Sequence, residues 1–168
     1  ASSRICVAAA SFSIYAFEAL KKELENVEEL RFIFTSPTFV KDKGKKEKRE
    51  FFIPKLNRER NLYGTDFEIR LRNQLSQKAI AKECAEWIKR KVRFKSNSTG
   101  DIMGGFLHVA DNSQHVYLPF NEFTTTELGC ERGNSVYQMV NVLPSPTAEA
   151  YLKIFNEQWD NEEKFSDV

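Results

Sequence analysis

The sequence predicts a single α/β domain in which helices flank a mixed β-sheet. Three observations predict it. Residues 5–35 alternate between an apolar strand, an amphipathic helix and a second strand, and a long helical pattern over 65–91 leads into a further strand. Three more strand-like runs then precede a last helix. The chain has 168 residues, of which 41% are hydrophobic and 29% charged, and this suits one domain, 1–168, with its own core.

The first 35 residues predict a β-α-β unit. The small apolar run Ile5–Phe12 suits a buried strand, and Ser13 is placed to cap the helix that follows. The apolar residues of that helix recur at helical spacing: Phe17, Leu20, Leu24 and Val27. Leu30–Thr35 is strongly strand-like before Ser36-Pro37 ends it. Two strands joined in this way favour a parallel pair with a right-handed crossover.

The middle of the chain predicts a loop, a long helix and a short strand. Residues 41–64 are dense in charge, and we expect them to form a basic loop insertion. Thr65–Lys91 has the longest helical pattern, opened by the capping box Thr65-Asp66-Phe67-Glu68 and carrying Trp87 on its apolar stripe. Val92–Lys95 is typical of a short strand.

The last third predicts three strands and a helix. The strands are expected over Gly105–Ala110, Val116–Phe120 and Val136–Leu143. Pro144-Ser145-Pro146 then breaks the chain, and Thr147 is expected to cap the final helix. Its apolar stripe would contain Ala150, Tyr151, Ile154, Phe155 and Trp159. We expect the acidic tail from Asn161 to fray.

Charge is distributed unevenly along the chain. The net charge is only +1, but residues 41–95 carry 18 basic and 8 acidic groups, whereas 145–168 carry 2 and 6. Such a polarised domain presents a local positive field. Basic groups with interleaved aromatics suit a nucleic-acid backbone, with contacts mainly to phosphates, and a solvated charged face is the alternative. The candidate contacts are Lys45, Lys46, Lys48, Arg49, Arg58, Arg60, Lys89, Arg90, Lys91 and Arg93.

The motifs of the commonest small α/β enzymes are missing from the sequence. There is no GxxxxGK[ST], no GxGxxG after a strand, no GxSxG and no HExxH. Cys6, Cys84 and Cys130 form no CxxC pair, and we expect each to be a buried free thiol in a reducing cytoplasm. We therefore expect no metal and no cofactor in this domain. No apolar run is long enough to span a membrane, and the start lacks a signal-peptide pattern.

The region from Gly104 to Val142 contains Gly105-Phe106-Leu107-His108-Val109, a strand with a histidine, then Phe120–Thr125, and then Arg132-Gly133-Asn134 before the closing strand. These features resemble the phospholipase D-like superfamily, which has Gly-Ser-x-Asn-Phe-Thr at the position of Phe120–Thr125. The β-α-β opening and a helix ending near Trp159 extend the similarity over nearly the whole chain. It is most similar to modules found N-terminal to ATP-dependent helicases. The resemblance thus implies a piece of a larger helicase-type protein.

The HxKxxxxD motif that the family uses for catalysis is degenerate here. Counted from His108, the lysine position holds Ala110 and the acid position holds His115. Counted from His115, these positions hold Tyr117 and Glu122. Losing one phosphate-holding group typically costs about a hundred- to a thousand-fold in rate. His108 is the only catalytic candidate. Its alternative roles are a structural strand histidine whose nitrogens are hydrogen-bonded to the backbone, or a contact to phosphate.

Three functions follow from these observations. The first is an accessory module that binds DNA through backbone contacts for an ATP-dependent helicase whose motor lies in the same parent chain, and that is catalytically inactive by itself. The second is an active phosphodiesterase or nuclease half-site that uses His108 in a two-fold dimer. The third is a protein-docking domain with Phe51-Phe52-Ile53 as its surface. We expect a cytoplasmic location and no membrane partner.

Overall fold

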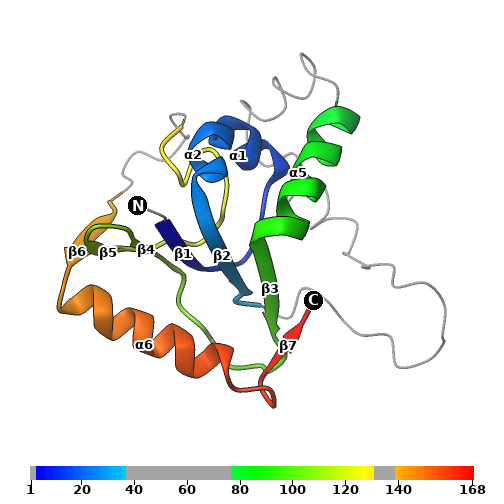
Figure 1. The fold of residues 1–168 in the computed structure, drawn as a ribbon. Coiled ribbons are helices and arrows are strands. Elements are labelled where there is room, and N and C mark those ends of the chain that lie inside the picture. The colour runs from blue at the N-terminus through cyan, green and yellow to red at the C-terminus, as the bar shows by residue number, and fades with distance from the viewer. Residues whose placement is uncertain (1–2, 37–76, 131–138) are drawn as a thin grey trace, which may run out of the picture.

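A mixed β-sheet of seven strands, in the order β6-β5-β4-β1-β2-β3-β7, forms the centre of the molecule (Figure 1). The structure is a computed structural model and describes residues 3–36, 77–130 and 139–168. The strands are β1 (Ser3–Ala9), β2 (Val27–Phe34), β3 (Val92–Asn97), β4 (Phe106–Ala110), β5 (Gln114–Leu118), β6 (Asn141–Pro144) and β7 (Phe165–Asp167). The helices are α1 (Ile14–Ala19), α2 (Lys21–Glu25), α5 (Gln77–Lys91) and α6 (Thr147–Trp159).

The predicted β-α-β opening is confirmed. β1 pairs in parallel with β2, and β2 pairs in parallel with β3. The remaining pairs, β1 with β4, β4 with β5, β5 with β6 and β3 with β7, are antiparallel. The predicted cap is also present, because the hydroxyl of Ser13 accepts a hydrogen bond from the backbone N–H of Tyr15 at 3.2 Å.

The predicted helix over 17–27 differs from the structure. It consists of two short helices, α1 and α2, that meet at Leu20, and Val27 already belongs to β2. Val27 is 4% exposed and pairs with Ser3 of β1, so sheet pairing takes this β-branched residue out of the helix. Helical spacing by itself did not separate the last turn of a helix from the first residue of a strand.

One face of the sheet is covered by α1, α2 and α5 (Figure 1). The apolar stripe predicted for the first helix is buried at Phe17 and Leu24, and Trp87 of α5 is 1% exposed. The Trp87 ring lies 5.1 Å from that of Phe17, and its indole N–H donates to the carbonyl oxygen of Leu24 at 3.2 Å. These residues are core residues, as the sequence predicted.

The opposite face is covered by α6 (Figure 1). The stripe predicted for this helix is partly wrong, because Ala150 is exposed and Ile154 is 44% exposed. The side turned to the sheet instead contains Ala148, Tyr151, Leu152, Phe155 and Trp159. The expected cap at Thr147 is wrong as well: Pro146 occupies the N-cap position and makes no side-chain cap bond.

The tail that the sequence predicts to fray is ordered as a strand. β7 pairs antiparallel with the edge of β3, with Asn97 opposite Phe165. Phe165 is 7% exposed and packs into the core under α6. Phe165 therefore anchors the strand by packing into the core, and β7 gives the edge of β3 a partner.

Several predictions lie outside the described residues. These are the basic loop over 41–64, the first part of the helix expected from Thr65, the patch Phe51-Phe52-Ile53 and Arg132-Gly133-Asn134. The strands expected around 92, 105 and 116 are confirmed as β3, β4 and β5, and the strand expected over 136–143 is described only as β6. In the described part of the chain, no helix is long and apolar enough to cross a membrane.

Candidate functional site

His108, the catalytic candidate of the sequence, lies in the middle of the sheet beneath α6. Neighbouring residues of β4 alternate between the two faces, and Phe106 belongs to the core under α6, so His108 points to the same side. Its side chain is 1% exposed. The Nε2 atom lies 3.2 Å from Oε1 of Gln114, which approaches it from β5. The partner is thus a side-chain amide, whereas the sequence suggested backbone groups.

A row of buried and half-buried polar side chains runs across the sheet from His108. Cys6 of β1 stands opposite His108, and Arg31 of β2 stands opposite Cys6. The guanidinium of Arg31 donates to the sulfur of Cys6 at 3.4 Å. Its carbon also lies 5.3 Å from the ring centre of Phe155 and 5.6 Å from that of Trp159, both on α6. The cation of this row is therefore an arginine stacked under a helix.

Burial favours the neutral forms of His108 and Cys6. Burial lowers the pKa of His108, and the Arg31 charge lowers it further, while the hydrogen bond with Gln114 acts in the opposite direction. Burial also raises the pKa of Cys6, against the smaller effect of Arg31. At neutral pH the imidazole is neutral and the thiol is protonated. With a side chain that is 1% exposed, His108 is out of reach of a phosphodiester in this conformation.

His115, the alternative start of the motif, lies on β5 and is half-buried. Its Nδ1 atom is 3.4 Å from the hydroxyl of Ser113 in the turn between β4 and β5. His115 pairs with Val109 across the β4–β5 ladder, whereas His108 pairs with Val116. Neighbouring positions on a strand face opposite sides, so the two histidines do not share one site.

The described part of the predicted nucleic-acid surface lies where α5 meets β3. Lys89, Arg90, Lys91 and Arg93 line a groove of about 340 Å³ together with Glu28, Glu29 and Val92. Lys91 is committed to the fold, because its ammonium donates to the carbonyl oxygens of Glu25 and Val27. This lysine holds the end of α5 to the start of β2 through two of the three N–H groups of its ammonium.

Acidic residues near the start of β2 offset part of the positive charge. Arg93 lies 3.6 Å from Glu29, and Arg4 lies 3.2 Å from Glu28. Both pairs are largely exposed, so they contribute little to stability and can exchange partners. Lys89 and Arg90 are exposed and form no ion pair with a described residue. A phosphate can reach both of them, and it can also reach Arg93, whose side chain is largely exposed.

The other predicted contacts, Lys45, Lys46, Lys48, Arg49, Arg58 and Arg60, lie outside the described residues. For the described ranges, no group of three or more histidine, cysteine or acidic side chains is placed to hold a metal ion. Cys6 and Cys84 are buried free thiols as predicted, and burial raises the pKa of Cys84 to about 12. The prediction for Cys130 is wrong, because it ends an exposed turn after Gly129.

Sequence reasoning missed Arg31 and Gln114 as neighbours of His108. Arg31 was visible as the one charged residue inside the apolar run 30–35, a signal that it faces something other than plain core. Gln114 carried no such signal, since a glutamine beside a turn is ordinary. Only the pairing of β4 with β5 brings its amide to the imidazole.

Comparison with known proteins finds no family model that matches the chain and no curated protein with significant similarity. The structure itself shows a mixed α/β architecture with helices on both faces of one sheet. The phospholipase D-like assignment stays a prediction from the motif residues given above.

Proposed function

We propose that this chain is a phospholipase D-like accessory module that binds DNA by its phosphate backbone and serves an ATP-dependent helicase. The observation that carries the proposal is the concentration of cationic charge between residues 41 and 95, which holds 18 of the 25 basic groups of the chain. Exposed Lys89 and Arg90 place part of this charge on one groove. The helicase motor is inferred from the resemblance alone, and a GxxxxGK[ST] motif downstream in the parent reading frame would support it.

The geometry around His108 favours a binding role over catalysis. The imidazole is 1% exposed, and the nearest cation of its row, Arg31, is already held by Cys6 and two aromatic rings. Nucleophilic attack on phosphorus needs an accessible imidazole and cations that hold the phosphate oxygens. If the chain cleaves DNA and a His108→Ala variant cleaves it equally well, His108 has no part in the reaction.

The test is a fluorescence-anisotropy titration of labelled DNA over a salt series. We expect the logarithm of the binding constant to fall linearly with the logarithm of the salt concentration. Replacing Lys89 and Arg90 together with alanine should weaken binding, and should reduce the slope by about one for each phosphate that the variant no longer neutralises. A second variant with Lys45, Lys46 and Arg49 replaced tests the segment outside the described residues in the same way.

The matched control is a double variant at Lys82 and Lys153. Lys82 lies about two turns before Lys89 on α5, and Lys153 lies on α6, across the sheet from the groove. The control variant removes the same number of charges outside the groove. We therefore expect a smaller loss of affinity than in the Lys89 and Arg90 variant, and an unchanged salt dependence. No binding at low salt would overturn the proposal, and so would an equal loss in the control variant.

A further inference from the structure

Two carboxylates lie among the cations of the groove between α5 and β3. Glu28 and Glu29 both line it, although consecutive residues of a regular strand point to opposite faces. A register shift at the start of β2 explains why both are there. Ser3 of β1 pairs with Val27 and Arg4 pairs with Glu29, so Glu28 is an extra residue, as in a β-bulge. The fold therefore places two adjacent acids in a groove that is otherwise cationic.

Each of these carboxylates already has an arginine partner. The two oxygens of Glu28 accept from Nε and a terminal nitrogen of Arg4, at 3.4 and 3.2 Å, the two-pronged arrangement in which arginine also holds phosphate. Oε1 of Glu29 lies 3.6 Å from Nε of Arg93, which is beyond hydrogen-bond distance. The side chain of Arg93 is 74% exposed. The Glu29–Arg93 pair is thus the looser of the two, and its arginine is open to a ligand in the groove.

We propose that Glu29 is an internal counter-anion that holds Arg93 in the free protein, and that a phosphate enters the groove by replacing this carboxylate. Carboxylate and phosphate oxygens accept from the same guanidinium donors, so they compete for one arginine. An exposed ion pair contributes a factor of up to about five to an equilibrium constant. Glu29 therefore lowers the affinity for phosphate and does not block binding. The inference rests on the proposed function in so far as the phosphate belongs to DNA.

This exchange makes the groove selective for neighbouring phosphates. A single phosphate at Arg93 forms one ion pair and breaks another, so its net gain is small. An adjacent phosphate also reaches Lys89 and Arg90, which are exposed and form no ion pair with a described residue. Their attraction is gained without breaking a pair. A strand or chain of phosphates should therefore bind more tightly than an isolated phosphate.

The first experiment measures the binding of labelled DNA at low salt by fluorescence anisotropy. Glu29→Gln should raise the affinity about two- to fivefold, because it releases Arg93. In an Arg93→Ala background, the same substitution should change the affinity by less than about 1.5-fold. The double variant separates the release of Arg93 from the mere removal of a negative charge, which would act equally in both backgrounds.

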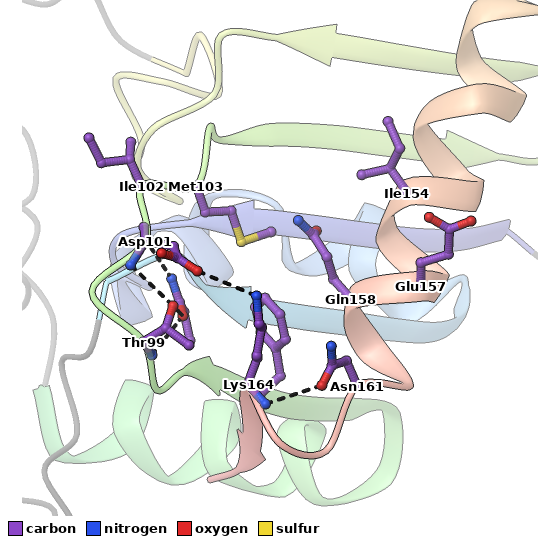
Figure 2. Close-up of a pocket in the computed structure, with 11 residues that line it drawn as sticks. Thr99, Asp101, Ile102, Met103, Ile154, Glu157, Gln158, Asn161 and Lys164 are labelled. Atoms are coloured by element: carbon purple, nitrogen blue, oxygen red, sulfur yellow. Dashed lines mark hydrogen bonds and ion pairs between the residues drawn. The ribbon is translucent and has the colours of Figure 1, made fainter.

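The matched control is the ion pair between Asp101 and Lys164, which lines a second cavity of about 320 Å³ (Figure 2). Its charged atoms are also 3.6 Å apart, and both side chains are more than half exposed. This cavity opens after the end of β3, whereas the groove lies at its start, and six strand residues span about 20 Å. That exceeds the screening length of about 10 Å at 0.1 M salt. Asp101→Asn should therefore change the affinity for DNA by less than about 1.5-fold.

The second experiment does not depend on DNA. The isotope-labelled chain is titrated with sodium tripolyphosphate or with inorganic phosphate, and the Nε–H signal of Arg93 is followed by NMR. Tripolyphosphate should shift this signal, and inorganic phosphate should need a concentration at least about fivefold higher, because it engages fewer cations. Glu29→Gln should lower the half-saturating concentration of tripolyphosphate about two- to fivefold.

The outcomes separate this inference from the proposed function. If the parent chain bound DNA and Glu29→Gln bound it equally well, the inference would be overturned and the proposed function would stand. The inference would also fail if Glu29→Gln gained as much affinity in the Arg93→Ala background, if Asp101→Asn gained as much, or if tripolyphosphate left the Arg93 signal unchanged. Conversely, tripolyphosphate exchange with the expected Glu29→Gln effect, but without DNA binding, would support the inference and overturn the proposed function.

Discussion

Replacing Gly105 with alanine should destabilise the junction between β4 and the loop that precedes it. A Cβ atom at this position would lie 2.0 Å from the carbonyl oxygen of Phe120 and 3.0 Å from that of Ala8. Both neighbours are backbone atoms and cannot rotate away. Phe120 donates its N–H to the carbonyl of Gly105 at 3.1 Å, and Ala8 pairs with Phe106 in the sheet.

The size of the effect follows from these distances. A carbon and a carbonyl oxygen normally approach no closer than about 3.3 Å, so the backbone of Phe120 has to move by more than about 1 Å. Forcing extra atoms into a packed site costs about 1–3 kcal/mol, and breaking the hydrogen bond adds about 1 kcal/mol. We therefore expect Gly105→Ala to lower the free energy of unfolding by about 3 kcal/mol, measured by urea unfolding followed by circular dichroism.

Gly104→Ala is the matched control, because a Cβ there has no described heavy atom within 4 Å. The substitution reduces the freedom of the unfolded chain, so it should change the free energy of unfolding by no more than about 1 kcal/mol, in the stabilising direction. If the two variants unfolded at the same urea concentration, the close approach of Phe120 to Gly105 would be refuted.

Three further predictions concern buried polar groups. Gln158→Met should raise the free energy of unfolding by about 1 kcal/mol, because it removes a buried carbonyl without a described partner, and a loss of stability would contradict this. The pKa of His108 is lowered in the folded state. The free energy of unfolding should therefore be highest above the ordinary histidine pKa of about 6.5, and it should decrease as the pH falls from there through the lower pKa of the folded state. In a His108→Leu variant, the free energy of unfolding from urea titrations should depend less on pH below about 6.5. If it changed with pH equally in the variant and the parent, the lowered pKa of His108 would be refuted. A thiol reagent should label Cys130 at once in the native protein and reach Cys6 and Cys84 only on unfolding, so rapid labelling of more than one thiol would contradict the burial.

The elements with strong local patterns were predictable. β1, β2 and the buried Trp87 lie largely where the sequence predicts them, because their burial follows from their apolar periodicity. The first strand is shorter than predicted, because β1 ends at Ala9 and the prediction ran to Phe12. β7 and the inner side of α6 were not predictable in this way. The position of Phe165 in the core and the exposure of Ile154 depend on how α6 is rotated over the sheet.

The candidate sites also combine features that the sequence shows with contacts that only the structure shows. The basic clusters are a property of the sequence, and the structure shows that Lys89 and Arg90 are exposed. The commitment of Lys91 to two carbonyl oxygens could not be inferred, because those oxygens belong to residues more than sixty positions away. The same holds for the pairing of Glu29 with Arg93, because β2 and β3 are distant in sequence.

The sequence by itself determined the α/β class, the parallel β-α-β opening and the uneven distribution of charge along the chain. These follow from periodicity and residue type, which act over a few neighbouring positions. The tertiary structure decided that His108 is sealed under α6 beside Arg31, that the tail closes the sheet, and that Glu28 and Glu29 both line one groove with Arg93. Strand pairing and helix packing join residues far apart in the chain, and no local pattern determines which partners they choose.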